Sequence, residues 1–541
     1  MRSYKEFYEA FDITEIKKTF NGDFDNFINA GIECCDRHCN DQKIAIYHYS
    51  AAGSKSVITY KKLMEESSKV ANFLLSQGIG AGDVIACMLP RIPELVFIMV
   101  GAWKVGAVYQ ALFAAFGPKA IQHRIESSDA KMLFTDSNNS TKLTDLALKT
   151  KICVVTNGDN DQIFSGYLNY RDEISKMEGF FKPVERRGSD AFLMLSTSGT
   201  TGLPKAIDIP LSAMASIKVY MEFGIDLRKN DIFWNLADPG WAYGLYYSVT
   251  GPLLLGNSFI LSEASFSAEE TFRIISECKV SNLAGSPTAF RLLMNAVKEK
   301  YVNISNNSLR IISSAGEALT KDVIMWYNNT MDVNIFDHYG QSETGMIINN
   351  HHALDHKKID GSMGVEMPGY KVVILDDNYQ PVSPNVPGNL AVDISKSPLF
   401  WFKGYSRSET ESLKGIYYLT GDSAEQDEDG LLTYIGRIDD VITSSGYRIG
   451  PFDVESVILE HSSVAEAAVI GKPDNERTEI VKAFIVLKHD FKSSEELKIE
   501  ISTFVKKRLA AHAYPREIEF VPKLPKTPSG KIQRFILRQQ M

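Results

Sequence analysis

The sequence predicts an α/β protein with a large N-terminal domain of α/β sheets that carries a small β-rich subdomain, followed by a small α+β C-terminal domain. Three observations predict this organisation. The chain has 541 residues, more than one hydrophobic core usually supports. Short apolar segments alternate with helical patterns in its first half, and this pattern changes after Gly436. At least two domains are therefore expected.

The first half contains the strand and helix patterns of a parallel sheet. Residues 84–89, 131–135 and 152–156 are short apolar segments typical of buried strands. Residues 63–77 and 93–105 repeat apolar side chains at helical spacing between such segments. Because parallel strands need crossover connections, this alternation predicts a parallel α/β sheet.

Two later regions lack intervening helices. Residues 370–375 and 388–394 are rich in strand-forming side chains and are bounded by Pro and Gly turns. A small β-rich subdomain is expected there.

The C-terminal part has a different composition again. Residues 464–470 and 482–487 resemble strands, residues 493–508 resemble a helix, and the tail is basic. We therefore predict a large domain over residues 1–436 and a small domain over residues 437–541.

Charge and composition exclude several classes of protein. Hydrophobic residues make up 44% of the chain and charged residues 23%, which is ordinary for a globular protein. The net charge of −9 argues against a general nucleic-acid-binding surface. Charged side chains near Met1 argue against a secretory signal. Anionic ligands must therefore be held by local positive charge.

The longest uncharged run, residues 239–262, contains several glycines and a proline, so buried strands and turns are expected there rather than a membrane span. The six cysteines predict reduced thiols in a cytoplasmic protein. A metal site at Cys34, Cys35, His38 and Cys39 is a less favoured alternative, because no second ligand pair lies nearby.

The segment 195–206 (LSTSGTTGLPKA) is the strongest single signal for a ligand. Its glycines allow the backbone to approach an anion, its hydroxyls donate hydrogen bonds, and Lys205 adds a positive charge. It does not match the Walker pattern, because Lys205 comes three residues after Gly202 and is followed by Ala206. A phosphate-binding loop of another type is predicted, with a flexible surface loop as the alternative.

Further motifs follow this loop in a fixed order. They are residues 237–244 (ADPGWAYG), 314–318 (SAGEA), 337–345 (DHYGQSETG), 418–422 (YLTGD) with 436–440 (GRIDD), and 525–531 (PKTPSGK). From about Tyr60 to the C-terminus, the chain resembles acyl-CoA synthetases of the adenylate-forming superfamily, which also contains luciferases and peptide-synthetase adenylation domains.

The resemblance implies an AMP-forming acid–thiol ligase. A carboxylate attacks the α-phosphate of ATP to give an acyl-adenylate and pyrophosphate, and CoA then releases AMP and forms the acyl-CoA. ATP, Mg²⁺ and CoA are the implied cofactors and co-substrates, and a small carboxylate is the remaining partner. The resemblance also implies that the C-terminal domain is mobile, with a hinge near Asp439, and that it rotates between the two half-reactions.

Several residues are assigned to the phosphates of ATP by this resemblance. The loop residues expected to bind ATP are Ser196, Thr197, Ser198, Gly199, Thr200, Thr201, Gly202 and Lys205. Glu343 is the expected Mg²⁺ ligand and Ser342 a donor to the α-phosphate, with a capping glutamate in an Asx/Ser-type turn as the less favoured alternative for Glu343. Lys531 matches the mobile lysine of adenylation, where a C-terminal lysine would otherwise be solvated.

The rest of the nucleotide is assigned in the same way. The backbone of Gly316, Glu317 and Ala318 and the ring of Tyr339 are expected to enclose adenine. The other residues implied at the nucleotide are Asp337, His338, Gly340, Gln341, Asp422 for the ribose hydroxyls, and Arg437.

The resemblance also assigns the CoA site and the acyl pocket. CoA is expected to contact Ser445, Gly446, Tyr447 and Arg448. The acyl pocket is expected to be lined by Trp241, Ala242, Tyr243, Ala315 and Gly340, with core packing as the alternative for Trp241.

Two small residues bear on the length of the acid. Acetate-specific members of the family carry tryptophan where this chain has Gly340, and a larger branched residue where it has Ala315. A short- to medium-chain acid longer than acetate is therefore expected, and Gly340→Trp is expected to shift preference toward acetate.

Three other functions compete with this interpretation. A stand-alone enzyme that loads a carrier protein would share the same nucleotide residues, and so would an aryl-CoA ligase. A catalytically dead homologue is disfavoured, because Glu343 and Lys531 are both present. No membrane span and no nucleic-acid partner are expected, and the sequence makes no prediction of an oligomeric state.

Overall fold

The computed structural model of the chain divides into two compact units. Unit 1 comprises Met1–Asp360, Gly364–Lys371 and Ile394–Glu411, and unit 2 comprises Gly361–Met363, Val372–Asp393 and Ser412–Met541. The structure describes residues 2–156, 161, 163–197, 204–298, 308–406, 408–444, 447–474, 477–509, 513–526 and 532–540. The predicted boundary between residues 436 and 437 stays a prediction.

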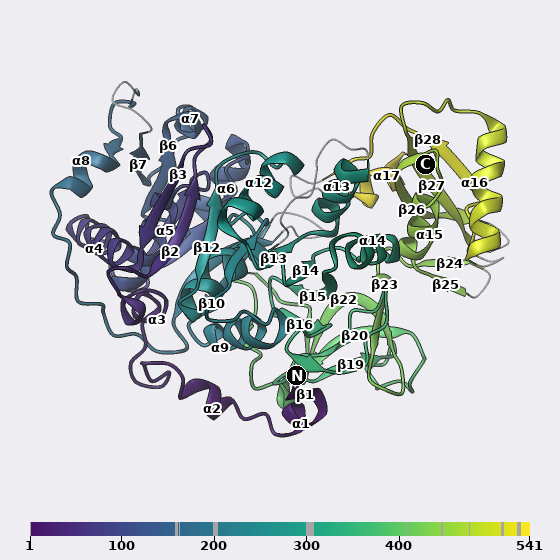
Figure 1. Cartoon of the computed structure of the whole chain (residues 1–541), viewed down its shortest axis with the longest axis horizontal. Helices are drawn as coiled ribbons and strands as arrows, with labels where there is room; N and C mark the ends of the chain where they lie inside the picture. Colours follow the sequence, from purple (N-terminus) through teal and green to yellow (C-terminus); the bar gives the residue numbers. More distant parts are fainter. Residues whose placement is uncertain are drawn as a thin grey trace. The chain divides into compact units, whose positions relative to one another are not determined.

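The first sheet of unit 1 has seven strands in the order β10-β9-β5-β4-β6-β7-β8. Its neighbouring strands β6 and β7 are labelled in Figure 1. The strands are β4 (Val84–Met88), β5 (Val108–Ala111), β6 (Met132–Asp136), β7 (Lys151–Val155), β8 (Leu168–Asn169), β9 (Ala191–Thr197) and β10 (Lys205–Pro210). All neighbours are parallel except β9 and β10. Helices α4 (Tyr60–Ser76), α5 (Pro93–Lys104) and α6 (Pro118–Ser128) intervene, which confirms the predicted alternation.

The second sheet of unit 1 has nine strands in the order β18-β16-β15-β14-β13-β11-β12-β2-β3. Six of them form its parallel centre: β15 (Asn334–Gln341), β14 (Ile311–Ala315), β13 (Asn282–Gly285), β11 (Ile232–Asn235), β12 (Ser258–Ser262) and β2 (Ile44–Tyr49). Antiparallel strands complete its edges: β16 (Gly345–Asn349), β18 (Val365–Glu366) and β3 (Lys55–Thr59).

An apolar core fixes helices against this sheet. Ile275 of α12 (Ala268–Cys278), Leu293 of α13 (Pro287–Lys298) and Tyr327 of α14 (Lys321–Met331) share a buried cluster with Leu283 and Ile312 of the strands. Burial of such side chains contributes about 1.5–3 kcal/mol each. This packing holds the ends of β14 and β15 in place.

The expectation of strands and turns across residues 239–262 is wrong for most of that run. It contains α10 (Ala242–Gly244), a π-helical turn η4 (Leu245–Thr250) and α11 (Gly251–Leu255) before β12. Every residue of η4 is buried, so its apolar residues form no single stripe and helical periodicity does not show in the sequence. No helix in the described part of the chain is long and apolar enough to cross a bilayer.

Unit 2 contains two sheets. An antiparallel sheet holds β19 (Val372–Leu375), β20 (Gly388–Asp393), β21 (Leu413–Lys414), β22 (Tyr417–Gln426) and β23 (Leu432–Arg437). The other holds β24 (Ile442–Ser444), β25 (Tyr447–Ile449), β26 (Val464–Asp474), β27 (Thr478–Leu487) and β28 (Glu517–Phe520). Together they confirm the strands expected in both regions.

Three helices accompany the second sheet of unit 2: α15 (Pro451–Leu459), α16 (Glu495–Arg508) and α17 (Arg534–Gln539). Ser494 caps α16 by accepting a hydrogen bond from the Leu497 amide. Ile501 and Val505 of α16 are buried in one cluster with Ala483 and Ile485 of β27. The α+β character predicted for this region is confirmed.

Candidate functional site

Two motifs on neighbouring strands meet at the carboxyl end of β14, beside the middle of β15. The strands run parallel, with Ser314 opposite Asp337 and Ala315 opposite His338. Gly316 then leaves the strand with φ +97°, a conformation that favours glycine, and the space beside its Cα is open. Ligands of parallel α/β sheets bind at this carboxyl edge. The sheet topology therefore brings together the 314–318 and 337–345 motifs, both assigned to the nucleotide.

Asp337 is a buried acid with unused hydrogen-bonding capacity. Its Oδ2 accepts from the Leu319 amide at 3.2 Å, and its Oδ1 has no hydrogen-bond partner among the described residues. Burial raises the pKa of Asp337 to about 8, so the carboxyl is largely protonated at neutral pH. A protonated carboxyl offers both a donor and an acceptor, which suits the edge of a purine.

A buried chain of polar groups begins at the next residue. The Tyr220 hydroxyl lies 2.7 Å from His338 Nδ1 and 3.5 Å from the Tyr243 hydroxyl. Burial keeps the pKa of His338 well below its usual range, so the imidazole is neutral. Sequence reasoning missed Tyr220, which lies on the π-helical turn η3 (Tyr220–Gly224). No local motif distinguishes it from other buried aromatic residues.

Glu343 lies in the turn that joins β15 to β16. Its side chain is nine-tenths buried, and its Oε1 accepts a hydrogen bond from the Tyr405 hydroxyl at 2.8 Å. The Ser342 carbonyl accepts from the Tyr246 hydroxyl at 3.0 Å. The segment is a turn that joins two antiparallel strands, so the structure leaves open both the metal-ligand role and the alternative that Glu343 is a capping residue in a turn.

Of the two strands on either side of the predicted phosphate loop, β9 and β10, the second carries the positively charged Lys205. Lys205 pairs with Thr197 across β9 and β10, and Ala206 pairs with Ser196. Ser198, Gly199, Thr200, Thr201 and Gly202 lie outside the described residues. Lys205 Nζ lies 5.0 Å from the centroid of the Tyr405 ring and donates to the Glu409 carbonyl at 3.5 Å. Tyr405, which no motif predicted, thus contacts both Lys205 and Glu343.

Asp422 and Arg437 face each other within unit 2. They are paired across β22 and β23, and Arg437 Nη1 lies 3.3 Å from Asp422 Oδ1. Tyr434 donates to the same oxygen at 3.4 Å. Gly421 has φ +73°, and a side chain there would meet Arg437 Nη2. The predicted ribose acid and its arginine are therefore adjacent.

The residues assigned to the second half-reaction are only partly described. Asp439 is exposed between β23 and β24, and its carbonyl accepts from Arg538 Nη2 at 2.9 Å. Tyr447 and Arg448 lie on β25, opposite Ser444 and Thr443. Ser445, Gly446 and Lys531 lie outside the described residues.

Gly340 is required by the backbone. The pairing of β15 with β16 is irregular between Tyr339 and Gly340, and a Cβ on Gly340 would lie 2.1 Å from the Gly345 carbonyl oxygen. Such a contact forces the backbone to move. The expectation that Gly340→Trp shifts preference toward acetate stays a prediction, and in this structure the variant also requires a backbone shift.

The other residues assigned to the acyl pocket have mixed surroundings. Trp241 packs against Phe113 and Phe116 with ring centroids 5.3 and 5.5 Å apart, while Ala315 is buried at the end of β14. Ala242 begins α10. Their role in binding an acid stays a prediction.

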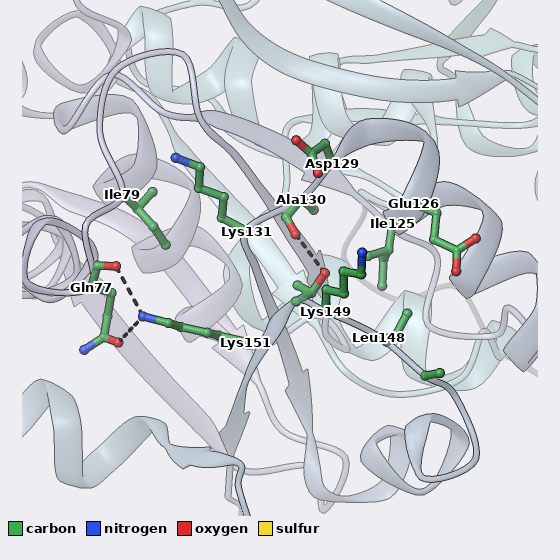
Figure 2. Close-up of a pocket in the computed structure, with 12 residues that line it drawn as sticks. Gln77, Ile79, Ile125, Glu126, Asp129, Ala130, Lys131, Leu148, Lys149 and Lys151 are labelled. Carbon is green, nitrogen blue, oxygen red and sulfur yellow. Dashed lines mark hydrogen bonds between the residues drawn. The ribbon is translucent and has the colours of Figure 1, made fainter.

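A cavity of about 550 Å³ lies elsewhere, at the amino ends of β6 and β7 (Figure 2). Lys131, Lys149 and Lys151 line it together with Glu126 and Asp129. Its position at the edge opposite the carboxyl ends of the strands separates it from the assigned residues.

No cluster of His, Cys, Asp or Glu in the described ranges has three or more members placed to hold a metal ion. The six cysteines, including Cys34, Cys35 and Cys39, are free thiols.

Comparison with known families gives two matches along the chain. The AMP-binding enzyme family matches residues 33–405, and the AMP-binding enzyme C-terminal domain matches residues 453–531.

Individual relatives agree with these matches. The acetyl-coenzyme A synthetase of Bacillus subtilis (strain 168) is 39% identical over 547 residues, which cover 99% of this chain and 95% of the relative. The human mitochondrial acyl-coenzyme A synthetase ACSM4 is 33% identical over 510 residues, which cover 92% of this chain and 86% of the relative.

Solved structures are similar over the same length. A crystal structure of a Brucella canis acyl-CoA synthetase has a TM-score of 0.82 and 49% identity, covering 100% of this chain and 99% of the other. The anthranilate CoA ligase AuaEII in complex with anthranoyl-AMP has a TM-score of 0.86 and 26% identity, covering 95% and 97%.

Proposed function

This chain belongs to the AMP-binding enzyme family and is an AMP-forming acyl-CoA synthetase, and from that premise we propose that its adenine and metal sites lie at the carboxyl ends of β14 and β15. The enzyme converts a carboxylate and ATP to an acyl-adenylate and pyrophosphate, and then transfers the acyl group to the CoA thiol with release of AMP. The observation that carries the proposal is the register that sets Ser314 beside Asp337 and continues to Glu343. Adenine then lies between the 316–318 backbone and the Tyr339 ring.

Glu343 is the proposed Mg²⁺ ligand. A buried carboxylate is a hard oxygen donor, and Mg²⁺ in nucleotide sites uses one or two carboxylates together with phosphate oxygens and water. One described carboxylate therefore fits the ion. Bound there, Mg²⁺ would neutralise charge on the phosphates, while Lys205 and the 196–202 loop hold them and Ser342 donates to the α-phosphate.

The remaining roles are assigned to unit 2. Asp422 accepts hydrogen bonds from the ribose hydroxyls, Arg437 orients Asp422, and Lys531 approaches the reacting carboxylate during adenylation. Residues 445–448 contact CoA after residues 437–541 rotate about a hinge near Asp439. The free thiols support a cytoplasmic location.

The acid is proposed to be a short- to medium-chain fatty acid longer than acetate. The buried methyl group of Ala315 beside β15 supports this choice, because a small side chain leaves room for additional methylenes, each contributing about 0.8 kcal/mol. The relatives do not decide the length of the acid, since one is named an acetyl-coenzyme A synthetase and another an acyl-coenzyme A synthetase.

The first experiment measures AMP and thioester formation with ATP, Mg²⁺ and CoA across acetate, propionate, butyrate, octanoate and benzoate. We expect thioester formation to peak beyond acetate. Ala315→Val should move that peak toward shorter acids and leave the KM for ATP unchanged. A profile that peaks at acetate in the wild type would contradict the proposed acid.

A further inference from the structure

Residues 401–406 contact both the strand that carries Lys205 and the turn that carries Glu343. The Ser406 amide donates to the Ala206 carbonyl at 2.8 Å, which extends pairing from β10. The Ser406 hydroxyl donates to Asp208 Oδ2 at 2.5 Å, and the Tyr405 amide donates to Thr410 Oγ1 at 2.8 Å. These bonds fix the backbone of Tyr405 beside the strand that carries Lys205.

The same segment reaches the turn that carries Glu343. The Trp401 ring packs edge-on against Tyr246 with centroids 6.4 Å apart, and the Tyr246 hydroxyl bonds to the Ser342 carbonyl. The Phe402 ring packs edge-on against Tyr405 at 5.2 Å. Aromatic contacts of this kind restrict the orientation of the Tyr405 ring.

Tyr405 contacts two opposite charges, one through its hydroxyl and one through its aromatic ring. Its hydroxyl donates to Glu343 Oε1 at 2.8 Å, and its ring face lies 5.0 Å from Lys205 Nζ. A cation over an aromatic ring is attracted by the ring's negative face, and it withdraws electron density from the phenol. The hydroxyl therefore becomes a stronger donor to the carboxylate, so the two contacts reinforce each other.

We propose that Tyr405 is a positioning residue that orients Glu343 for the metal and holds Lys205 for the triphosphate. This inference rests on the proposed role of Glu343 as the Mg²⁺ ligand. The hydroxyl fixes one carboxylate oxygen and thereby sets the direction of the other. The contact with the aromatic ring fixes the position of Lys205 Nζ.

The test compares metal-dependent and metal-independent binding without turnover. Binding of ATP is measured by calorimetry while Mg²⁺ is titrated, with no carboxylate or CoA present, and AMP binding serves as the reference. Tyr405→Phe keeps the ring and removes the hydroxyl, and it should raise the Mg²⁺ concentration at half-saturation about tenfold. AMP affinity should be unchanged, because AMP lacks the β- and γ-phosphates.

Three further variants complete the set. Glu343→Gln should raise the Mg²⁺ requirement about a hundredfold. Tyr405→Leu also removes the ring, so it should weaken ATP binding further at saturating Mg²⁺. Tyr327→Phe is the matched control, because its hydroxyl bonds to the Phe290 carbonyl within the helical core and should not affect Mg²⁺ dependence.

The outcomes separate the two proposals. If Glu343→Gln shifts the Mg²⁺ requirement and Tyr405→Phe does not, the inference about Tyr405 is overturned and the metal site stands. If Glu343→Gln leaves the requirement unchanged, the metal assignment fails and the inference falls with it. Equal ATP affinities for Tyr405→Leu and Tyr405→Phe would overturn the inference that the Tyr405 ring positions Lys205.

Discussion

Two buried acidic side chains, one in each unit, differ in whether they have an ion-pair partner. Asp337 in unit 1 has no ion-pair partner among the described residues, and burial raises its pKa to about 8. Glu455 in unit 2 is equally buried, but Arg534 Nη2 contacts both of its oxygens at 2.7 and 2.8 Å. Burial raises the pKa of Glu455, and Arg534 opposes that rise.

This difference separates acids that stabilise the fold from acids that are available to bind a ligand. An ion pair completed within the fold holds α15, β26 and α17 together, and removing either partner would leave a buried charge. An acid whose second oxygen has no partner in the described chain retains capacity for a ligand. Four predictions follow from this contrast, from the largest expected effect to the smallest.

Breaking the ion pair of unit 2 should have the largest effect on stability. Arg534→Met leaves Glu455 buried without its cation, which should lower the free energy of opening by about 3–5 kcal/mol. Hydrogen exchange of the amides of α15 and β26 measures this quantity. The control is Arg538→Met on the same helix, whose more exposed pair with Asp440 should contribute at most about 1 kcal/mol. Equal effects of the two variants would remove the distinction.

Removing the charge of Glu343 should affect catalysis instead. We expect Glu343→Gln to slow ATP–pyrophosphate exchange about a hundredfold, because charge on the phosphates is no longer balanced through the metal. The thermal midpoint should remain close to that of the wild type, since the amide oxygen can still accept from Tyr405. If the variant lost stability but kept its rate of ATP–pyrophosphate exchange, Glu343 would be a structural residue and not a metal ligand.

A substitution in the backbone next to Glu343 should have an intermediate effect on stability. Gly340→Ala places a methyl group 2.1 Å from the Gly345 carbonyl, and we expect a loss of about 1–3 kcal/mol as β15 and β16 shift. Hydrogen exchange across these two strands reports the change. Gly80→Ala is the control, because open space surrounds a Cβ there. Unchanged exchange in β15 and β16 would show that the turn tolerates a side chain.

The fourth prediction concerns pH, where the effect of a single pH unit is the smallest of the four. The pKa of Asp337 is about 8 in the folded chain and 3.8 in its unperturbed state, so between these values the folded state holds a proton that the unfolded state has lost. Its contribution to stability is therefore present at low pH and is lost as pH rises to about 8, by about 1.4 kcal/mol per unit. Asp337→Asn does not titrate.

The measurement is the difference between the thermal midpoints of Asp337→Asn and the wild type from pH 5 to pH 8. We expect the variant to gain relative to the wild type as pH rises. A constant difference would mean that Asp337 is ionised in the folded chain throughout this range.

Local patterns predicted much of the fold and supplied the hypotheses for the candidate site. The apolar segments near residues 84, 131 and 152 are strands, because their hydrophobicity and length reflect burial on both faces of a parallel sheet. The helix expected at 493–508 begins after the Ser494 cap. The prediction for the run 239–262 is wrong, because a helix buried on all sides has no amphipathic pattern.

By itself, the sequence determined the fold class, the order of the motifs assigned to ligands and their chemical types, since each depends on residues that are neighbours in the chain. Only the tertiary structure decided that Tyr220 bonds to His338, that Tyr405 contacts both Lys205 and Glu343, and that Gly340 is enclosed by the Gly345 backbone. These contacts join residues from separate elements, and the packing of the sheets sets their distances. A linear pattern carries no information about them, because any of several aromatic residues could have occupied the same place.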